Sequence, residues 1–442
     1  MPVFQESCAE QIQAQTIIII HPGSMYLRMG RASDLNPCTL LNAVARRRLS
    51  GGVEYKDGFL PFVVPRTKEL TQAMEESRLQ VSHTLQSCLQ SDGRRRYATP
   101  PQQIAAFNRR SNPEIQSPSK AEWIKMDKDI IVGDDILSLN PEDNFNIHFP
   151  YKRGELNIHS GPGGSLKAVM ADLKTIWEYV LTEKMDIPLR DLKHYRAVLV
   201  IPDIYNRHYL RELTTLMLCE IGFGGCFLLQ DHVAATFGAG LGYACVVDVG
   251  DQKTSVSCVE DGISHRNTRR RGMKENLEQA LEMQEEVVAP TAVGEEEVVV
   301  DAVDSAPIAL SNRDLDAPRD FVVGPQQLLG LDHAILQSID RCPTEDLKRK
   351  MYSCILVVGS GMKFQGIGMW LHNRISLQIP YMYRAEQLDI ITQPKEMDPG
   401  MTAWKGAAIL SCLESAQELW IGRQEWERIG VRILRERAPF MW

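Results

Sequence analysis

A short run of acidic, glycine and hydroxyl residues stands between two β-rich segments near the middle of the sequence. It reads Asp248, Val249, Gly250, Asp251, Gln252, Lys253 and Thr254. Gly250 lets backbone N–H groups approach an anion, Asp248 can hold a metal ion or its water, and Thr254 adds a hydroxyl. The run predicts a hairpin whose turn binds phosphate. An ordinary hairpin with a polar tip is the alternative, because short Gly and Asp motifs are common.

Two other glycine turns follow predicted strands. The first is Gly23, Ser24 and Met25, after the β-branched run Ile17–Ile20. The second is Gly359, Ser360 and Gly361, between an apolar strand at 352–358 and a helix that continues towards Ile375. Glycine next to a helix N-terminus permits close backbone approach to a phosphate. Each turn taken alone could equally be a sharp turn that binds nothing.

The segments around these turns alternate between strand and helix patterns. Apolar residues at helical spacing predict helices, and β-branched runs predict strands. The expected elements are helices at 166–185, 207–221 and 231–237, strands at 195–201 and 224–229, and a final helix from Trp404 to Trp420. Alternating strands and helices joined by short loops indicate an α/β sheet protein.

Composition excludes several classes of protein. The chain has 442 residues, 44% hydrophobic and 24% charged, with a net charge of −8, which opposes a generally basic nucleic-acid coat. Its ten cysteines contain no Cys-x-x-Cys pair, as expected in a reducing compartment and without a zinc site. We find no signal peptide and no apolar run of transmembrane length, so we expect an intracellular, soluble protein.

Two segments are less regular. Residues 31–145 carry arginine groups at 46–48, 94–96 and 109–110, which could contact DNA phosphate or an acidic partner, or could be solvated loop charge. Residues 275–312 contain ten acidic residues and no Lys or Arg. This composition is typical of a flexible connector, and a histone-binding segment is the alternative.

The order of these motifs resembles the actin superfamily. His21–Ser24 is similar to its first phosphate loop, Asp248–Thr254 to the second, and Gly359–Gly361 to its adenosine motif. Gln230 and Trp404–Leu410 resemble the regions that connect its two lobes. The resemblance implies an α/β, two-lobe, ribonuclease-H-like fold. The first lobe would comprise 1–238 and 402–442, with 31–145 irregular, and the second 239–401, with 269–324 as an acidic connector.

The resemblance is strongest to nuclear members of the superfamily, and it implies a role. ATP would be held by the three turns, with Asp248 holding magnesium through water and Gln230 positioning an attacking water. The chain would be a nuclear subunit of a chromatin remodeller of the Ino-eighty type, in transcription regulation, DNA recombination and DNA repair. Its partners would be actin and another actin-related protein on a helical segment of the motor subunit, histones or nucleosomes, and linker DNA, with no membrane.

Three departures from the family pattern modify this expectation. His21 stands where the family has an aspartate, and Met25 stands where it has a glycine. Imidazole is a poorer magnesium ligand than carboxylate. The interval 269–324 is too short and too polar for the subdomain that the family inserts there, so we expect that subdomain to be shortened or missing. The chain is therefore predicted to hold nucleotide without being an enzyme, with at most very weak ATP hydrolysis.

Two other functions remain open from the sequence. An active actin-like ATPase or a sugar kinase would need a catalytic carboxylate in the cleft, and the only candidates are Asp248 and Asp231. A filament-forming cytoskeletal relative of actin would need a self-complementary surface. We identify no such charge pattern in the sequence.

Overall fold

The computed structural model describes residues 13–49, 51–55, 128–140, 143–273, 330–362, 367–384, 387–394 and 397–438. Contacts between these residues divide the chain into two compact units. The first comprises Met1–Val44, Val132–Asp134 and Phe149–Trp442, and the second comprises Ala45–Ile131 and Asp135–His148.

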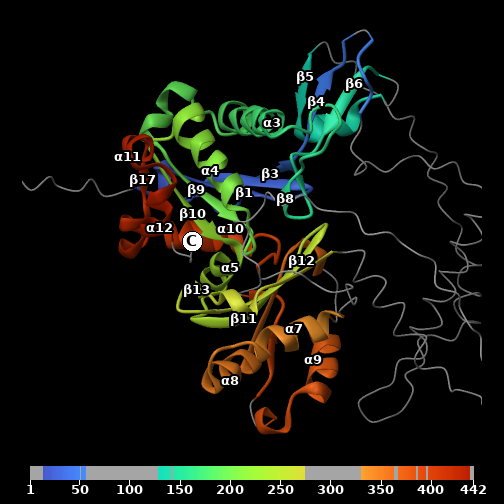
Figure 1. Ribbon diagram of the computed structural model, residues 1–442, viewed down its shortest axis with the longest axis vertical. Coiled ribbons are helices and arrows are strands. Elements are labelled where there is room, and N and C mark those ends of the chain that lie inside the picture. Colours follow the sequence, from blue (N-terminus) through green and yellow to red (C-terminus); the bar gives the residue numbers. More distant parts are fainter. Residues whose placement is uncertain are drawn as a thin grey trace, which may run out of the picture. The chain divides into compact units, whose positions relative to one another are not determined.

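The first unit contains a six-stranded sheet in the order β17-β10-β9-β1-β2-β3 (Figure 1). Strands β1, β2 and β3 form an antiparallel meander, and β9 and β10 continue the sheet in parallel with β1. The strands are β1 (Ile17–Pro22), β2 (Tyr26–Arg31), β3 (Cys38–Leu41), β9 (Arg196–Ile201), β10 (Gly225–Gln230) and β17 (Ile421–Gly422).

The side chains of β1 alternate between two hydrophobic cores, as the two-residue period of a strand requires. Ile18 and Ile20 belong to a core that includes side chains of the helical segments 166–185 and 207–221. Ile17 and Ile19 belong to a second core on the other face. All four isoleucines are fully buried, which explains the uninterrupted β-branched run in the sequence. The helices of the first core are α3 (Leu166–Tyr179), α4 (Arg207–Thr215), α11 (Arg423–Ile429) and α12 (Leu434–Arg437).

A second sheet in the same unit repeats this arrangement. Its order is β13-β12-β11-β15-β16, with β14 paired to β12, so a meander again continues into parallel strands. The strands are β11 (Tyr243–Val249), β12 (Lys253–Glu260), β13 (Ile263–Ser264), β14 (Arg270–Met273), β15 (Cys354–Val358) and β16 (Asp389–Ile391). One face packs against α7 (Leu331–Asp340), α8 (Glu345–Ser353) and α9 (Ile367–Gln378).

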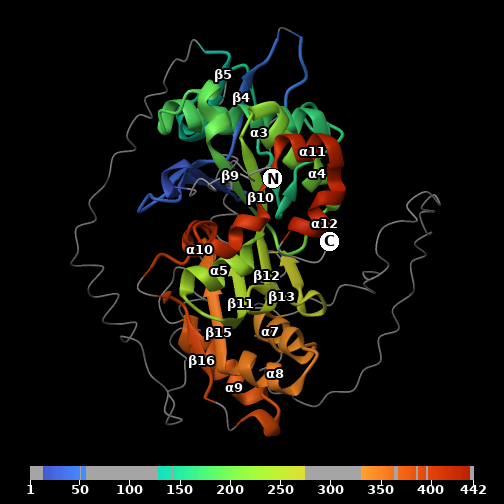
Figure 2. The ribbon, with the colours of Figure 1, turned by 90° about the vertical axis from the view of Figure 1, so that its left-hand side faces the viewer.

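Helices α5 (Asp231–Ala239) and α10 (Thr402–Ser411) pack against each other and contribute to a core that both sheets share (Figure 2). Trp404 is fully buried there, and its Nε1 donates to the Ile19 carbonyl oxygen at 3.3 Å. The helices cross very closely at Gly406. A Cβ at that position would lie within 2.6 Å of the Gly238 nitrogen and even nearer the Ala234 oxygen. A substituted Gly406 would therefore force the two helices apart.

The second unit contains a three-stranded sheet in the order β5-β4-β6. Its strands are β4 (Val44–Arg47), β5 (Ile130–Val132) and β6 (Phe145–His148); a separate hairpin of the first unit consists of β7 (Tyr151–Lys152) and β8 (Glu155–Leu156). Arg47 forms an ion pair with Asp129 at 2.9 Å, and Arg48 forms one with Glu54 at 3.3 Å. Arg47 and Arg48, two members of the first arginine group, therefore form ion pairs within the chain. The groups at 94–96 and 109–110 lie outside the described residues.

Most predicted elements are present, with three corrections. The final helix does not reach Trp420: α10 ends at Ser411, whose hydroxyl donates to the Ala408 carbonyl, and Leu413 has an extended backbone. The strand predicted at 352–358 begins only at Cys354, since Tyr352 and Ser353 still belong to helix α8. Within 31–145 the described residues form the short strands β3, β4 and β5, and the irregular character of the range stays a prediction. The connector predicted at 269–324 begins later, since Arg270–Met273 is strand β14. The acidic residues at 275–312 lie outside the described residues.

The two large sheets fall within the ranges predicted for the two lobes, and the exact lobe boundaries stay a prediction. The cysteines within the described residues are free thiols. Among the helices of the described residues, we find none that is both long and apolar enough to cross a membrane.

Candidate functional site

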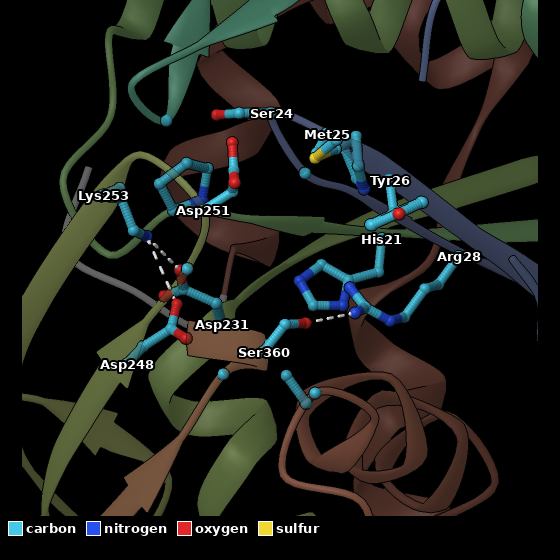
Figure 3. Close-up of a pocket in the computed structure, with 18 of the residues that line it drawn as sticks. His21, Ser24, Met25, Tyr26, Arg28, Asp231, Asp248, Asp251, Lys253 and Ser360 are labelled. Atoms are coloured by element: carbon cyan, nitrogen blue, oxygen red, sulfur yellow. Dashed lines mark hydrogen bonds and ion pairs between the residues drawn. The ribbon is translucent and has the colours of Figure 1, made fainter. Parts of the chain in front are cut away.

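The turns of the β1–β2 and β11–β12 hairpins both border one cavity of the first unit (Figure 3). The turn after β15 closes another side of this cavity, whose volume is about 270 Å³. The residues around it are His21, Pro22, Gly23, Ser24, Met25, Tyr26, Arg28, Tyr151, Gly154, Val200, Ile201, Pro202, Asp231, Asp248, Gly250, Asp251, Gln252, Lys253, Val358, Gly359, Ser360, Gly361, Pro399, Gly400 and Ala403. The three glycine-containing turns found in the sequence therefore meet in space.

The first turn is held in place by Asn42, which is fully buried directly after β3. Its Nδ2 donates to the Gly23 carbonyl oxygen at 2.8 Å, and its backbone nitrogen donates to the Met25 carbonyl oxygen at 2.7 Å. Two carbonyls of the turn are thereby bonded away from the cavity. Among the described residues, the contacts that fix this turn come from the side chain and backbone amides of Asn42 and involve no charged group.

The third turn depends on Gly359, which has a φ of +100°. A left-handed backbone is the conformation that glycine adopts without strain. A Cβ at Gly359 would also clash with the Val249 carbonyl, and it would lie only 2.6 Å from an Asp248 oxygen. The turns after β11 and β15 therefore approach each other too closely for any side chain at Gly359.

Lys253 is the central charged residue of the second turn. Its Nζ lies 2.7 Å from Asp231 Oδ2 and 3.7 Å from Asp248 Oδ2 (Figure 3). Burial lowers the pKa of Lys253, but the charges of Asp231 and Asp248 outweigh this and raise it overall. Burial raises the pKa of Asp231, and Lys253 brings it below its usual value. Lys253 and Asp231 therefore form a charged pair at the base of the cavity.

Asp248 responds differently to the same surroundings. Burial raises the pKa of Asp248, the charge of Lys253 opposes that rise, and repulsion from Asp231 adds to it. The net direction of the pKa is upward, with burial as the largest cause, and Lys253 lies a full ångström farther from Asp248 than from Asp231. The ammonium of Lys253 therefore stabilises the charged form of Asp231 more than that of Asp248.

His21 and Arg28 lie directly opposite each other on β1 and β2. Burial, together with the positive charge of Arg28, lowers the pKa of His21 to about 3, so its ring is neutral near pH 7. His21 Nδ1 is buried without a hydrogen-bond partner. Arg28 Nη2 donates to Ser360 Oγ at 2.7 Å and joins β2 to the turn after β15 (Figure 3).

A second polar cluster lies behind Lys253. His232 is fully buried, and its two ring nitrogens contact the hydroxyls of Ser257 and Ser255 at 2.6 and 2.9 Å. Asp203 forms an ion pair with Arg269, with 3.3 Å between Oδ2 and Nε. The ligand atoms of Asp203, Asp231 and His232 lie near enough for a metal ion, but each side chain already has a polar partner. We interpret this cluster as a buried network of hydrogen bonds and ion pairs, not as a metal site.

The predicted site residues divide into two groups. Gly23, Ser24, Met25, Asp248, Gly250, Asp251, Gln252, Lys253, Gly359, Ser360 and Gly361 all border the cavity. Val249, Thr254 and Gln230 are not among the residues that border it. Gln230 is buried, and its Nε2 donates to the Asp203 carbonyl oxygen at 3.0 Å. That bond turns its amide donor to the backbone.

Sequence analysis missed Arg28 and the pairing of Asp231 with Lys253. Arg28 lies in a strand, where an arginine usually faces solvent, and nothing nearby in the sequence marks its contact with Ser360. Asp231 and Lys253 are far apart in the chain, although a lysine inside a predicted phosphate turn was a usable signal. Pro399 and Gly400 also border the cavity and come from a segment without a recognisable motif.

The two large sheets have the same strand order in their meander and parallel parts, and a pair of helices packs between them. A hairpin turn of each sheet faces the same cavity. These features define an actin-like nucleotide-binding fold. The model of the family described as Actin matches residues 12–273 and 277–439. The chain belongs to the actin family.

Individual relatives agree with this assignment. Actin-related protein 8 of Aedes aegypti is 46% identical, in an alignment that covers 98% of this chain and 99% of that protein. Actin-related protein 8 of Homo sapiens is 35% identical and covers 98% of this chain and 93% of its own length. The solved structure of human actin-related protein Arp8 in its ATP-bound state superimposes with a TM-score of 0.77 and 37% identity, covering 100% of both chains.

The alignment with the Aedes aegypti protein extends over 555 positions, whereas this chain has 442 residues. The relative therefore contains segments that this chain lacks. The shortened or missing insert at 269–324 stays a prediction.

Proposed function

We propose that this chain is a nucleotide-binding, non-catalytic actin-related subunit of a chromatin-remodelling complex. The observation that carries the nucleotide part is the meeting of three glycine turns around a single cavity that also contains Arg28 and Lys253. Backbone N–H groups and two cations are the donors that a polyphosphate needs. The human relative whose fold matches this one was solved in its ATP-bound state.

The residues of this chain suggest how ATP would be held. The turns at Gly23–Met25 and Gly250–Gln252 would direct backbone N–H groups at the phosphates, and Arg28 would add a positive charge. The Gly359–Gly361 turn would lie against the nucleoside. Bound nucleotide would stabilise the folded chain by mass action, by about 2.7 kcal/mol at a ligand concentration a hundred times Kd.

Slow hydrolysis is the second part of the proposal. Gln230 donates to a backbone carbonyl, and His21, neutral near pH 7, replaces an acid beside the first turn. Gln230 does not border the cavity, so it is not placed to position an attacking water, and an imidazole with a pKa of about 3 is a weak base for taking a proton from water. An active ATPase or sugar kinase is the rival outcome.

The nucleotide content of the purified full chain tests these two parts together. We expect retained ATP, loss of it in Arg28→Met, and a steady-state turnover far below that of ordinary ATPases, whose kcat values are about 1 s⁻¹ or higher. A turnover in that range would establish an enzyme and contradict the proposal. Absence of nucleotide from the wild-type chain, with no binding on addition of ATP, would contradict nucleotide binding itself.

The chromatin part of the proposal rests on the likeness to the relatives named above and on the nuclear role that the resemblance in the sequence implies for this chain. The partners would be actin and another actin-related protein on a helical segment of the motor subunit, with histones, nucleosomes and linker DNA as further contacts. Transcription regulation, DNA recombination and DNA repair would follow from that complex. Purification of the tagged chain from nuclear extract should recover these subunits; a filament that sediments with ATP and magnesium would contradict the proposal.

A further inference from the structure

The carboxylates that border the cavity are the natural ligands for a divalent cation, and two of them already have partners. Among the described residues around the cavity, the carboxylates are Asp231, Asp248 and Asp251. Asp231 Oδ1 accepts from the His232 backbone nitrogen at 2.9 Å, and Asp231 Oδ2 accepts from Lys253 at 2.7 Å. Both oxygens of Asp231 are thus engaged, and Asp248 shares the same ammonium.

The position of the Lys253 ammonium is fixed by packing. Lys253 is 9% exposed, and a Cβ at Gly154 would lie 2.6 Å from its Cδ. The β7–β8 hairpin therefore contacts the aliphatic part of the side chain and leaves it little freedom. The ammonium is held between two carboxylates, 2.7 Å from Asp231 and 3.7 Å from Asp248, and it engages oxygens that a cation would need as ligands.

The first hairpin supplies no replacement ligand. His21 is neutral near pH 7, its Nδ1 has no partner, and the guanidinium of Arg28 lies opposite it. Mg²⁺ requires oxygen ligands, usually carboxylates, phosphates and water, in an octahedral arrangement. A neutral imidazole next to an arginine does not provide such a ligand. Asp251 is then the one described carboxylate at the cavity that Lys253 does not engage, and a single carboxylate does not make up the donor set of the magnesium site that actin-like folds hold.

We infer that the ammonium of Lys253 takes the place of the divalent metal, so that this chain binds nucleotide without Mg²⁺. The inference rests on the proposed nucleotide binding and goes beyond it, because it assigns the charge-neutralising role to a residue of the chain. Lys253 and Arg28 would face the phosphates from opposite sides of the cavity. The acids that remain near the phosphates are partly neutralised by Lys253 without any bound ion.

The first test compares ATP binding by the full chain in excess Mg²⁺ and in EDTA. For the wild type, we expect the two Kd values to agree within about threefold. In Lys253→Met, the free carboxylates should repel the phosphates, so binding in EDTA should weaken by about tenfold or more and Mg²⁺ should restore much of it. A wild-type Kd that rises by about tenfold on removal of Mg²⁺ would overturn the inference.

The second test measures the metal directly and does not depend on nucleotide. Electron paramagnetic resonance titration with Mn²⁺ should show no tight site in the wild type and one new site in Lys253→Met. The double variant Asp248→Asn with Lys253→Met should lose that site. A tight Mn²⁺ site in the wild type that disappears in Asp248→Asn would overturn the inference.

Two further variants keep the tests decisive. Lys350→Met removes a lysine of α8 that is paired with Glu260 at the same 2.7 Å distance but is half exposed. It should leave both metal measurements unchanged. If Lys253→Met does not fold, Lys253→Gln removes the charge but keeps a polar side chain next to Asp231, and it should still gain an Asp248-dependent Mn²⁺ site. Failure of the wild type to bind ATP in either buffer would contradict the proposed function, while the Mn²⁺ titration would still decide the role of Lys253.

Discussion

The two hairpin turns at the cavity share a topology and differ in chemistry. The β1–β2 turn is fixed by the amide of Asn42, and next to it His21 is neutral near pH 7 and has an unpartnered buried nitrogen. The β11–β12 turn is flanked by an ammonium whose nitrogen lies within 4 Å of two carboxylates. Repetition of a fold therefore does not repeat the chemistry of its turns.

This difference predicts how much stability a substitution should cost at each turn. A turn that is held by neutral hydrogen bonds loses a modest free energy when one of them is removed. A buried ion pair is different, because removal of one partner leaves an uncompensated charge in a poorly solvated place. The second turn should therefore respond far more strongly to substitution than the first.

The largest expected effect is that of Asp231→Ala. Loss of this carboxylate leaves Lys253 with only the more distant Asp248, so unfolding should become easier by about 3–5 kcal/mol. Urea unfolding followed by circular dichroism measures the change. Glu260→Ala is the matched control, since it breaks the exposed 2.7 Å pair with Lys350 and should cost less than about 1 kcal/mol. Equal losses in both variants would contradict the comparison.

A smaller effect is expected for Asn42→Ala at the first turn. The Gly23 carbonyl would lose its donor, at a cost of about 1–3 kcal/mol, and the released turn should bind ATP more weakly. Ser338→Ala is a suitable control, because Ser338 is buried on α7, does not border the cavity and donates to the Thr268 carbonyl at 2.7 Å. It should lose similar stability with an unchanged Kd. A change in Kd of the same size in both variants would exclude a specific role for Asn42.

The pH dependence of stability should also distinguish the two turns. Because the folded-state pKa of His21 is about 3 and the ordinary value is 6.5, the unfolded chain binds the proton first. Stability from this group is complete above pH 6.5 and declines as the pH falls towards 3, by at most about 1.4 kcal/mol per pH unit. Comparison of wild type with His21→Gln by thermal unfolding at several pH values isolates this slope. Parallel profiles for the two proteins would rule it out.

The smallest expected effect is that of His21→Asp. A carboxylate at this position would place a magnesium ligand in the first turn, opposite Arg28. Binding of ATP in Mg²⁺ should tighten by about threefold relative to binding in EDTA, because Lys253 still occupies the other carboxylates. Calorimetric titration in the two buffers measures the ratio. A ratio equal to that of the wild type would show that His21 does not determine metal dependence.

Local sequence patterns predicted the strands and turns that carry the cavity. Ile17–Ile20, Tyr243–Val249 and Cys354–Val358 are apolar runs long enough to mark buried strands, and glycine follows each of them within three residues. The motif order then indicated which turns meet. These features depend on residues close together in the chain, which a sequence displays directly.

Long-range contacts were not predictable in the same way. The distance between Arg28 and Ser360 along the chain is 332 positions, and only the folded sheets bring them together. The pairing of Lys253 with Asp231 depends on how the N-terminus of α5 meets β12. The early end of α10 depends on the backbone at Leu413, where the apolar pattern continues although the helix does not.

The crossing of α5 and α10 has a mechanical consequence. At Gly406 the two backbones meet without intervening side chains, so the contact has no rotamers that could repack. Packed interfaces usually switch between discrete arrangements of interlocking side chains. The α5–α10 crossing lacks that means of switching, and any change in the angle between these helices must be a rigid rotation about the glycine contact.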